Sequence, residues 1–291
     1  MMVFYKYLTI EGLKIFFREA GSPHHPAIVL LHGFPSSSHM FRDLIPLLAD
    51  CFHVIAPDYP GFGNSSMPTT EEYEYTFDNL SLVIEKLLTA LRVSQYILYV
   101  HDYGGPIGFR LAVRNPKRIL GFVIQNAVAH EQGLGEPFAL FKALWANPNP
   151  ATKAAFARLT TFDFTKKQYL TGACNPYLIS PDGYSLDQFF LDRPGNSQIQ
   201  LQLGYDYRQN VAAYPAWQHY LRTWQPPTLV AWGKNDFIFT LAGAQAFSQE
   251  LISIETCFLC GGHFVLEEQS LPVSLLIKSF FGRIYSWPAL K

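Results

Sequence analysis

The sequence lacks an excess of charge of either sign. Its 291 residues include 22 Lys and Arg and 23 Asp and Glu, which gives a formal net charge of −1. The basic residues are scattered and form no basic arm, so no nucleic-acid partner is expected. No cationic amphipathic helix is evident, which argues against a membrane surface as a partner.

Long hydrophobic runs are also missing. A membrane-spanning helix needs ~18 uninterrupted apolar residues, and the chain has no such run. Charges interrupt the N-terminal segment at Lys6, Glu11, Lys14, Arg18 and Glu19. This segment therefore has no signal-peptide core, and we expect a cytoplasmic protein.

Cysteine is scarce, with Cys51, Cys174, Cys257 and Cys260 as the four residues of this type. Cys257-x-x-Cys260 has the spacing of a redox or metal-ligand pair, but no second Cys or His pair completes a zinc site. We expect reduced cysteines, as is usual in the cytosol. We expect neither a metal nor another cofactor.

Apolar and aromatic residues are plentiful. They make up 49% and 15% of the chain, enough for a large buried core. The length exceeds the common single-domain size of ~100–150 residues. One large α/β domain, or a core with an insertion, is therefore expected.

Short apolar runs bounded by turn residues predict strands. The expected strands are 3–8, 13–18, 27–31, 52–56, 96–100, 118–125, 227–232 and 254–259. The expected helices are 39–50, 77–92 and one that begins near Gly104. Alternation of helices with fully apolar strands indicates a mostly parallel sheet covered on both faces.

This alternation stops at about residue 127 and resumes at about residue 227. The intervening segment is helical or irregular, with Pro and Gly clusters at 147–150 and 193–195. We therefore expect a core of residues 1–126 and 227–291, with residues 127–226 inserted as a mainly helical cap.

Three strand ends carry side chains suited to catalysis. Asp102 follows 96–100, Asp236 follows 227–232, and His263 follows 254–259. Reactive residues gather at the carboxyl ends of parallel strands, so these three are candidates for one site. Alone, Asp102 could be a helix N-cap and Asp236 an exposed turn residue.

The chain resembles the α/β-hydrolase superfamily over nearly its whole length. His32-Gly-Phe-Pro35 is similar to the family's oxyanion loop, and 58–63 to its strand-loop signature. Val100-His-Asp-Tyr-Gly104 resembles the nucleophile elbow, with Asp where Gly-x-Ser-x-Gly has Ser. An Asp at this position is similar to the nucleophile of the epoxide hydrolase and haloalkane dehalogenase branch. The resemblance implies an α/β-hydrolase fold with an eight-stranded sheet and a cap.

An Asp nucleophile changes the permitted reaction. A carboxylate is ionised at neutral pH, and its attack on saturated carbon gives an ordinary alkyl ester of Asp102. His263, oriented by Asp236, would then activate water to hydrolyse that ester. The backbone N–H groups of Phe34 and Tyr103 would hold the oxyanion.

Residues next to the predicted nucleophile and in the cap bear on the leaving group. The resemblance implies that a dehalogenase has Trp directly after the nucleophile or Asn in the third place of the oxyanion motif. Here those positions hold Tyr103 and Phe34, so we expect an epoxide hydrolase. Tyr207, in Tyr205-Asp-Tyr-Arg-Gln-Asn210, resembles the ring-opening tyrosine of that group. Tyr169 is the preferred second tyrosine.

Several alternatives stay open. Tyr177 and Tyr184 rival Tyr169, and any cap tyrosine can serve packing alone. The second candidate enzyme is a haloalkane or haloacid dehalogenase of the fluoroacetate type. A third candidate is a catalytically silent hydrolase-fold binding protein. The expected partners are a small, mainly apolar organic substrate and water, and the expected oligomeric state is a monomer or homodimer.

Overall fold

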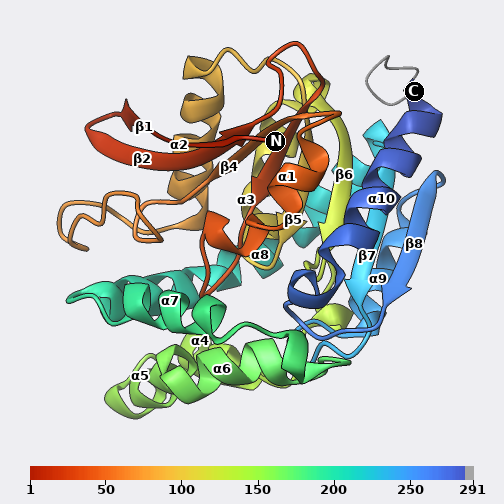
Figure 1. The fold of residues 1–291 in the computed structure, drawn as a ribbon. Coiled ribbons are helices and arrows are strands. Elements are labelled where there is room, and N and C mark those ends of the chain that lie inside the picture. The colour runs from red at the N-terminus through yellow and green to blue at the C-terminus, as the bar shows by residue number, and fades with distance from the viewer. Residues whose placement is uncertain (286–291) are drawn as a thin grey trace.

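A computed structural model describes residues 1–285 and has an eight-stranded sheet at its centre (Figure 1). The strand order is β1-β2-β4-β3-β5-β6-β7-β8. The strands are β1 (Val3–Ile10), β2 (Leu13–Ala20), β3 (Ala27–Leu31), β4 (His53–Pro57), β5 (Tyr96–His101), β6 (Ile119–Gln125), β7 (Thr228–Gly233) and β8 (Ile254–Leu259). The β1–β2 and β2–β4 pairs are antiparallel, and the other neighbours are parallel. The predicted mostly parallel sheet is confirmed.

Burial explains the sequence of the central strands. Every residue of β3, β4, β5 and β7 is buried. A strand that is covered on both faces needs apolar side chains on both faces. These strands are therefore nearly continuous apolar runs, and they bring their carboxyl ends to one edge of the sheet.

Helices pack on the two faces of this sheet. The core helices are α1 (Leu44–Leu48), α2 (Phe77–Ala90), α3 (Gly104–Arg114), α9 (Leu241–Ala246) and α10 (Leu266–Ile284). The helix expected at 39–50 is instead a short 3-10 turn at Ser38–Phe41 followed by α1. Pro46 explains the break, because proline lacks an N–H and is tolerated in the first turn of a helix.

Five further helices lie between β6 and β7. They are α4 (Phe138–Ala146), α5 (Pro150–Ala157), α6 (Phe162–Leu170), α7 (Pro181–Leu191) and α8 (Asn196–Trp224). Figure 1 shows α4 to α7 gathered below the sheet, whereas α8 runs back beside the core. We call residues 127–226 the cap. Its status as a separate domain stays a prediction.

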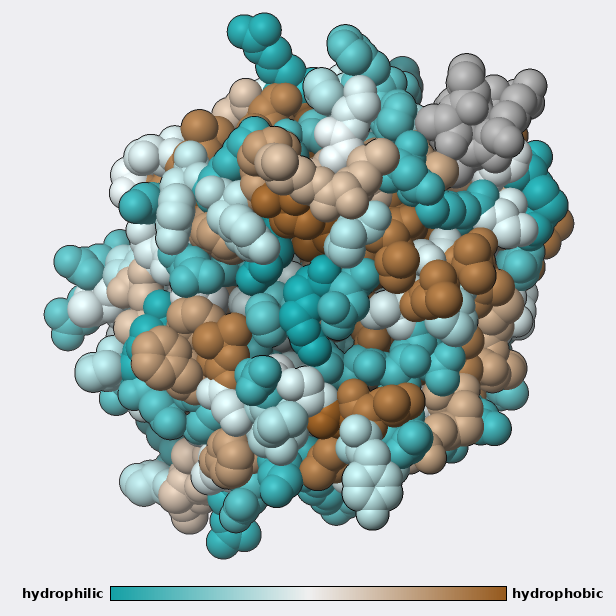
Figure 2. Space-filling view, in the orientation of Figure 1, coloured by the Kyte–Doolittle hydropathy of each residue, from teal (hydrophilic) through white to brown (hydrophobic). Residues whose placement is uncertain are grey.

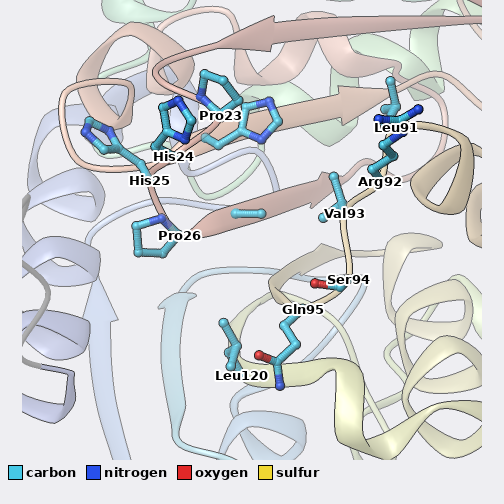
Figure 3. A pocket seen from close by; sticks show the side chains of 12 residues that line it. Pro23, His24, His25, Pro26, Leu91, Arg92, Val93, Ser94, Gln95 and Leu120 are labelled. Atoms are coloured by element: carbon cyan, nitrogen blue, oxygen red, sulfur yellow. The ribbon is translucent and has the colours of Figure 1, made fainter.

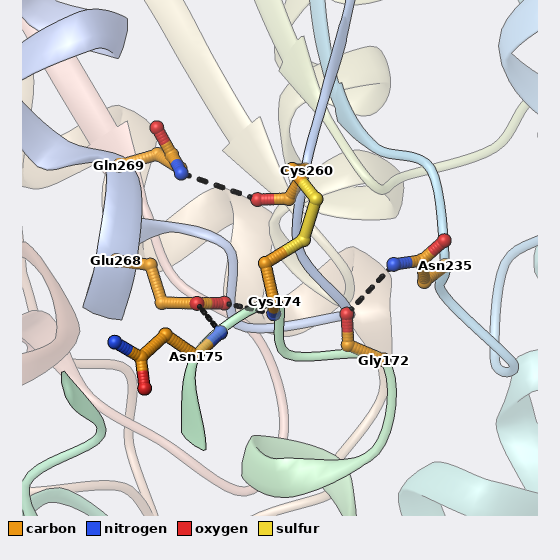
Figure 4. The surroundings of a disulfide bond; sticks show 7 residues. All are labelled: Gly172, Cys174, Asn175, Asn235, Cys260, Glu268 and Gln269. Carbon is orange, nitrogen blue, oxygen red and sulfur yellow. Dashed lines mark hydrogen bonds between the residues drawn. A yellow bond between two sulfur atoms is a disulfide. The ribbon is translucent and has the colours of Figure 1, made fainter. Parts of the chain in front are cut away.

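A disulfide joins the cap to the core, contrary to the expectation that all four cysteines are reduced. Cys174 of the cap is bonded to Cys260, just after β8, with their Cα atoms 5.8 Å apart (Figure 4). The expectation failed because these residues are 86 positions apart, and folding alone brings them together. Cys51 and Cys257 are the free cysteines of residues 1–285.

Hydrogen bonds reinforce this junction between cap and core. Glu268 accepts from the backbone N–H groups of Cys174 and Asn175, at 3.1 and 2.6 Å. The side chain of Asn235 donates to the carbonyl of Gly172 at 2.9 Å (Figure 4). The cap segment 172–175 is therefore fastened to the loops that follow β7 and β8 and to the first turn of α10.

The surface mixes hydrophilic and hydrophobic side chains. Figure 2 shows hydrophobic side chains as separate patches among hydrophilic ones on the face that it presents. No helix within residues 1–285 is both long and apolar enough to cross a bilayer. The cytoplasmic location stays a prediction, and a disulfide is unusual there.

Candidate active site

Asp102 lies at the sharp turn between β5 and α3. Its φ is +48°, in the left-handed region that non-glycine residues rarely occupy. A Cβ at Gly104 would come within 2.1 Å of the Leu31 carbonyl oxygen. Glycine is therefore needed at Gly104, because α3 starts in direct contact with β3. This geometry turns the Asp102 side chain out of the sheet at its carboxyl edge.

The Asp102 carboxylate is held by the two amides that the sequence predicts for an oxyanion hole. The N–H of Phe34 donates to Oδ1 at 2.6 Å, and the N–H of Tyr103 also donates to the carboxylate. The other oxygen, Oδ2, lies 3.9 Å from Nε2 of His263. One oxygen is therefore fixed by amides while the other faces the histidine.

Burial sets the protonation of Asp102. It raises the pKa of the carboxyl to about 6, and the attraction of His263 and the N–H groups of Phe34 and Tyr103 limits the rise. The carboxylate remains the main form at neutral pH.

Close packing positions the loop that contains Gly33 and Phe34. A Cβ at Gly33 would fall 2.3 Å from Cβ of Asp102, so glycine lets this loop reach Asp102. His32 donates from Nδ1 to the Gly33 carbonyl at 3.0 Å, and its ring stacks on Tyr59. These contacts keep the N–H of Phe34 directed at Asp102.

His263 and Asp236 are in direct contact. Nδ1 of His263 lies 2.8 Å from Oδ2 of Asp236, and Oδ1 of Asp236 accepts from the N–H of Ile238 at 2.7 Å. A proton on Nδ1 leaves Nε2 as the basic atom, and Nε2 has no hydrogen-bond partner within residues 1–285. Burial lowers the pKa of His263, but Asp236 and Asp102 together raise it above its ordinary value.

Sequence reasoning missed one residue of this group, Asn126. It is buried at the carboxyl end of β6 with a φ of +44°. Its Nδ2 donates to Oδ2 of Asp236 at 2.8 Å, and its Oδ1 accepts from the N–H of Gly233 at 2.9 Å. Asn126 therefore fixes the carboxylate that orients His263. Its place directly after a predicted strand was the available signal.

A small cavity adjoins Asp102. Its volume is about 30 Å³. It is lined by Phe34, Asp102, Tyr103, Pro137, Phe138, Phe141, Phe156, Leu159, Phe164, Gln168 and Ile238. The cap supplies most of these side chains, so cap residues would surround a substrate bound beside Asp102.

The structure does not bring the hydroxyl of Tyr169 to this cavity. That hydroxyl donates to Asp187 at 2.5 Å, and the ring stacks on Phe264. Successive helix residues point about 100° apart, and the preceding residue, Gln168, lines the cavity instead. Of the two rivals, Tyr177 is 96% exposed and Tyr184 packs against the Tyr169 ring.

Tyr207 lies close to the site without lining the cavity. Its ring packs against Tyr103, with 5.9 Å between centroids, and its hydroxyl lies beside that of Tyr214. Burial raises the pKa of Tyr207 well above its ordinary value, so the phenol is a weak acid.

A larger depression lies at the opposite edge of the sheet (Figure 3). Its volume is about 1110 Å³, and its lining includes His24, His25, Arg92 and Gln95 at the amino ends of β3 and β5. No cluster of three or more metal-ligating side chains is found in the described part of the chain. Asp102, Asp236 and His263 lie at the carboxyl edge of the sheet, so this depression is separate from them.

Comparisons with known proteins agree with the fold. The model of the alpha/beta hydrolase fold family matches residues 26–270. An uncharacterized hydrolase of Saccharomyces cerevisiae is 42% identical, over 96% of this chain and 97% of the yeast protein. A cis-3-alkyl-4-alkyloxetan-2-one decarboxylase of Shewanella oneidensis is 30% identical, over 94% of this chain and 87% of its own length.

Solved structures share the architecture. A haloalkane dehalogenase from Bradyrhizobium elkani has a TM-score of 0.81 and 20% identity, covering 97% of this chain and 99% of its own. The epoxide hydrolase CorEH has a TM-score of 0.77 and 23% identity, covering 98% and 100%. The chain therefore belongs to the alpha/beta hydrolase fold family.

Proposed function

We propose that this hydrolase attacks saturated carbon with Asp102 and passes through an alkyl ester of that residue. The observation that carries the proposal is that the two oxygens of the Asp102 carboxylate have different surroundings. Oδ1 is held by the Phe34 amide, while Oδ2 lies 3.9 Å from the basic nitrogen of His263. Oδ2 is thus the attacking atom, and Oδ1 becomes the ester carbonyl already seated among N–H donors.

Hydrolysis of the ester follows from the same geometry. His263 takes a proton from water, and the hydroxide adds to Cγ of Asp102. The negative charge then develops on Oδ1, where Phe34 and Tyr103 donate. The bond from Cγ to Oδ2 breaks, the product alkoxide takes the proton from His263, and Asp102 loses its own proton to solvent.

The preferred substrate class is a small, neutral, mainly apolar epoxide. Apart from Asp102, Gln168 and Tyr103, the cavity is lined by apolar side chains, which suits an apolar substrate. An epoxide places the leaving oxygen next to the attacked carbon, so the substrate needs little space. The missing Trp after Asp102 also favours an epoxide over a haloalkane.

The second candidate substrate is an oxetan-2-one. It is favoured by the similarity to the Shewanella oneidensis decarboxylase over 94% of the chain. Like an epoxide, this compound has a strained ring in which a saturated carbon bears an oxygen leaving group. Asp102 could attack that carbon in the same way.

The proposal is tested by trapping the ester in His263→Gln, which cannot activate water. The variant is incubated with butylene oxide, bromobutane or a dialkyl oxetan-2-one, and the peptide with Asp102 is weighed. We expect the mass of the whole epoxide to be added. Addition of a butyl group from bromobutane would indicate a dehalogenase, and addition of the lactone would indicate the oxetanone activity.

The matched control is the double variant Asp102→Asn, His263→Gln, which should gain no mass. No adduct in His263→Gln with any of the three compounds, and no turnover by the wild type, would contradict the proposal. That result would favour a catalytically silent binding protein.

A further inference from the structure

Gln168 is the unexplained polar side chain of the cavity. It lies on α6, four residues after Phe164, so both side chains point from one face of the helix into the space beside Asp102. Gln168 is only 1% exposed, and its Nε2 has no hydrogen-bond partner within residues 1–285. Leaving a buried amide unpaired costs stability, so a ligand that pairs with it is a direct explanation.

We propose that Gln168 determines the leaving group by donating an N–H to it while Asp102 attacks; this inference rests on the proposed function. The amides of Phe34 and Tyr103 already hold Oδ1 of Asp102. The remaining lining offers the Gln168 amide and the ring of Tyr103, which packs against Phe34 and Phe77. Of these two side chains, Gln168 has the buried donor that is left without a hydrogen-bond partner within residues 1–285, so its N–H is available to a leaving atom.

The chemistry of an amide defines its role in the step. Oδ2 of Asp102 forms a bond to the ring carbon, the carbon–oxygen bond of the ring breaks, and its electron pair passes to the oxygen. The N–H of Gln168 stabilises this oxygen by hydrogen bonding but does not give up its proton. The alkoxide takes a proton from water, and the proton that Asp102 later loses to solvent balances it.

The test is Gln168→Met, which keeps the length of the side chain and removes the N–H. In the His263→Gln background, the rate of adduct formation from butylene oxide should fall by about 100-fold, as for the loss of one donor to a developing anion. With His263 intact, hydrolysis of the adduct should keep its rate within about threefold, since Gln168 acts before that step. The melting temperature should stay the same or rise, because an unpaired buried amide is gone.

Gln200→Met is the matched control. Gln200 is also a cap glutamine at 1% exposure, but it donates to Asn196 and does not line the cavity. Its substitution should leave adduct formation unchanged. Tyr207→Phe and Tyr103→Phe test the phenols, and both should lose less activity than Gln168→Met.

Each other outcome overturns the inference. An unchanged rate of adduct formation in Gln168→Met removes Gln168 from the reaction. An equal loss of rate in adduct formation and in adduct hydrolysis, with a lower melting temperature, would show that Gln168 serves packing. A larger loss in either Tyr→Phe variant transfers the role to that tyrosine. If His263→Gln alone yields no adduct, the proposed function fails and this inference with it, whereas an adduct with an unaffected Gln168→Met rate contradicts the inference alone.

Discussion

At the scale of single residues, Asp102 combines an unusual backbone with an unusual environment. Its positive φ lifts the side chain out of the sheet, and the close approach at Gly104 makes that turn possible. Burial then raises the pKa of the carboxyl to about 6. The same residue therefore borders the cavity and carries a carboxyl group whose pKa is raised.

The raised pKa of Asp102 predicts how the rate of ester formation falls at acidic pH. In the proposed mechanism only ionised Asp102 attacks, so the rate should be constant above about pH 7 and fall about tenfold per pH unit well below pH 6. Rapid-quench measurement of ester formation by the wild type checks this. In His263→Gln, loss of the histidine charge that lowers the pKa of Asp102 should move the midpoint upward. A midpoint near pH 4 would contradict the buried environment.

At the scale of elements, the orientation of α6 could not be predicted from the sequence. The sequence favoured Tyr169, but the helix directs Gln168 to Asp102 and Tyr169 to Asp187. Successive helix residues point about 100° apart, so the rotation of α6 about its axis decides which of the two side chains faces the cavity. Packing of α6 against the core fixes that rotation. Asp102, Asp236 and His263 were predictable because each follows a strand whose end is visible as an apolar run.

The junction between cap and core yields a stability prediction. The bond from Cys174 to Cys260 spans 86 positions, and closing such a loop in the unfolded chain is worth about 4.6 kcal/mol in the chain-entropy model. Cys174→Ser should lower the free energy of unfolding by up to that amount, measured by denaturant titration without reductant.

Cys257→Ser is the control for this prediction, since Cys257 is free and only partly buried. It should change the free energy of unfolding by less than about 1 kcal/mol. Equal effects of the two substitutions, or no effect of reductant on the wild type, would show that the bond is not formed in solution.

At the scale of the whole molecule, sequence predicted the sheet, the strand ends and the position of the helical segment. Those features depend on hydrophobic patterns along the chain, which are local. The disulfide, the Asn126 contact with Asp236 and the lining of the cavity join segments far apart in the sequence. They depend on how the folded cap meets the sheet, which no local pattern encodes.

The most direct test of the covalent mechanism is a single turnover of butylene oxide by the wild type in ¹⁸O-labelled water. If Asp102 forms the ester and water attacks its Cγ, the labelled oxygen stays in the Asp102 carboxylate and the diol is unlabelled. Mass spectrometry of the diol and of the peptide with Asp102 measures both. Label in the diol and none in Asp102 would show direct attack of water on the substrate and contradict the covalent mechanism.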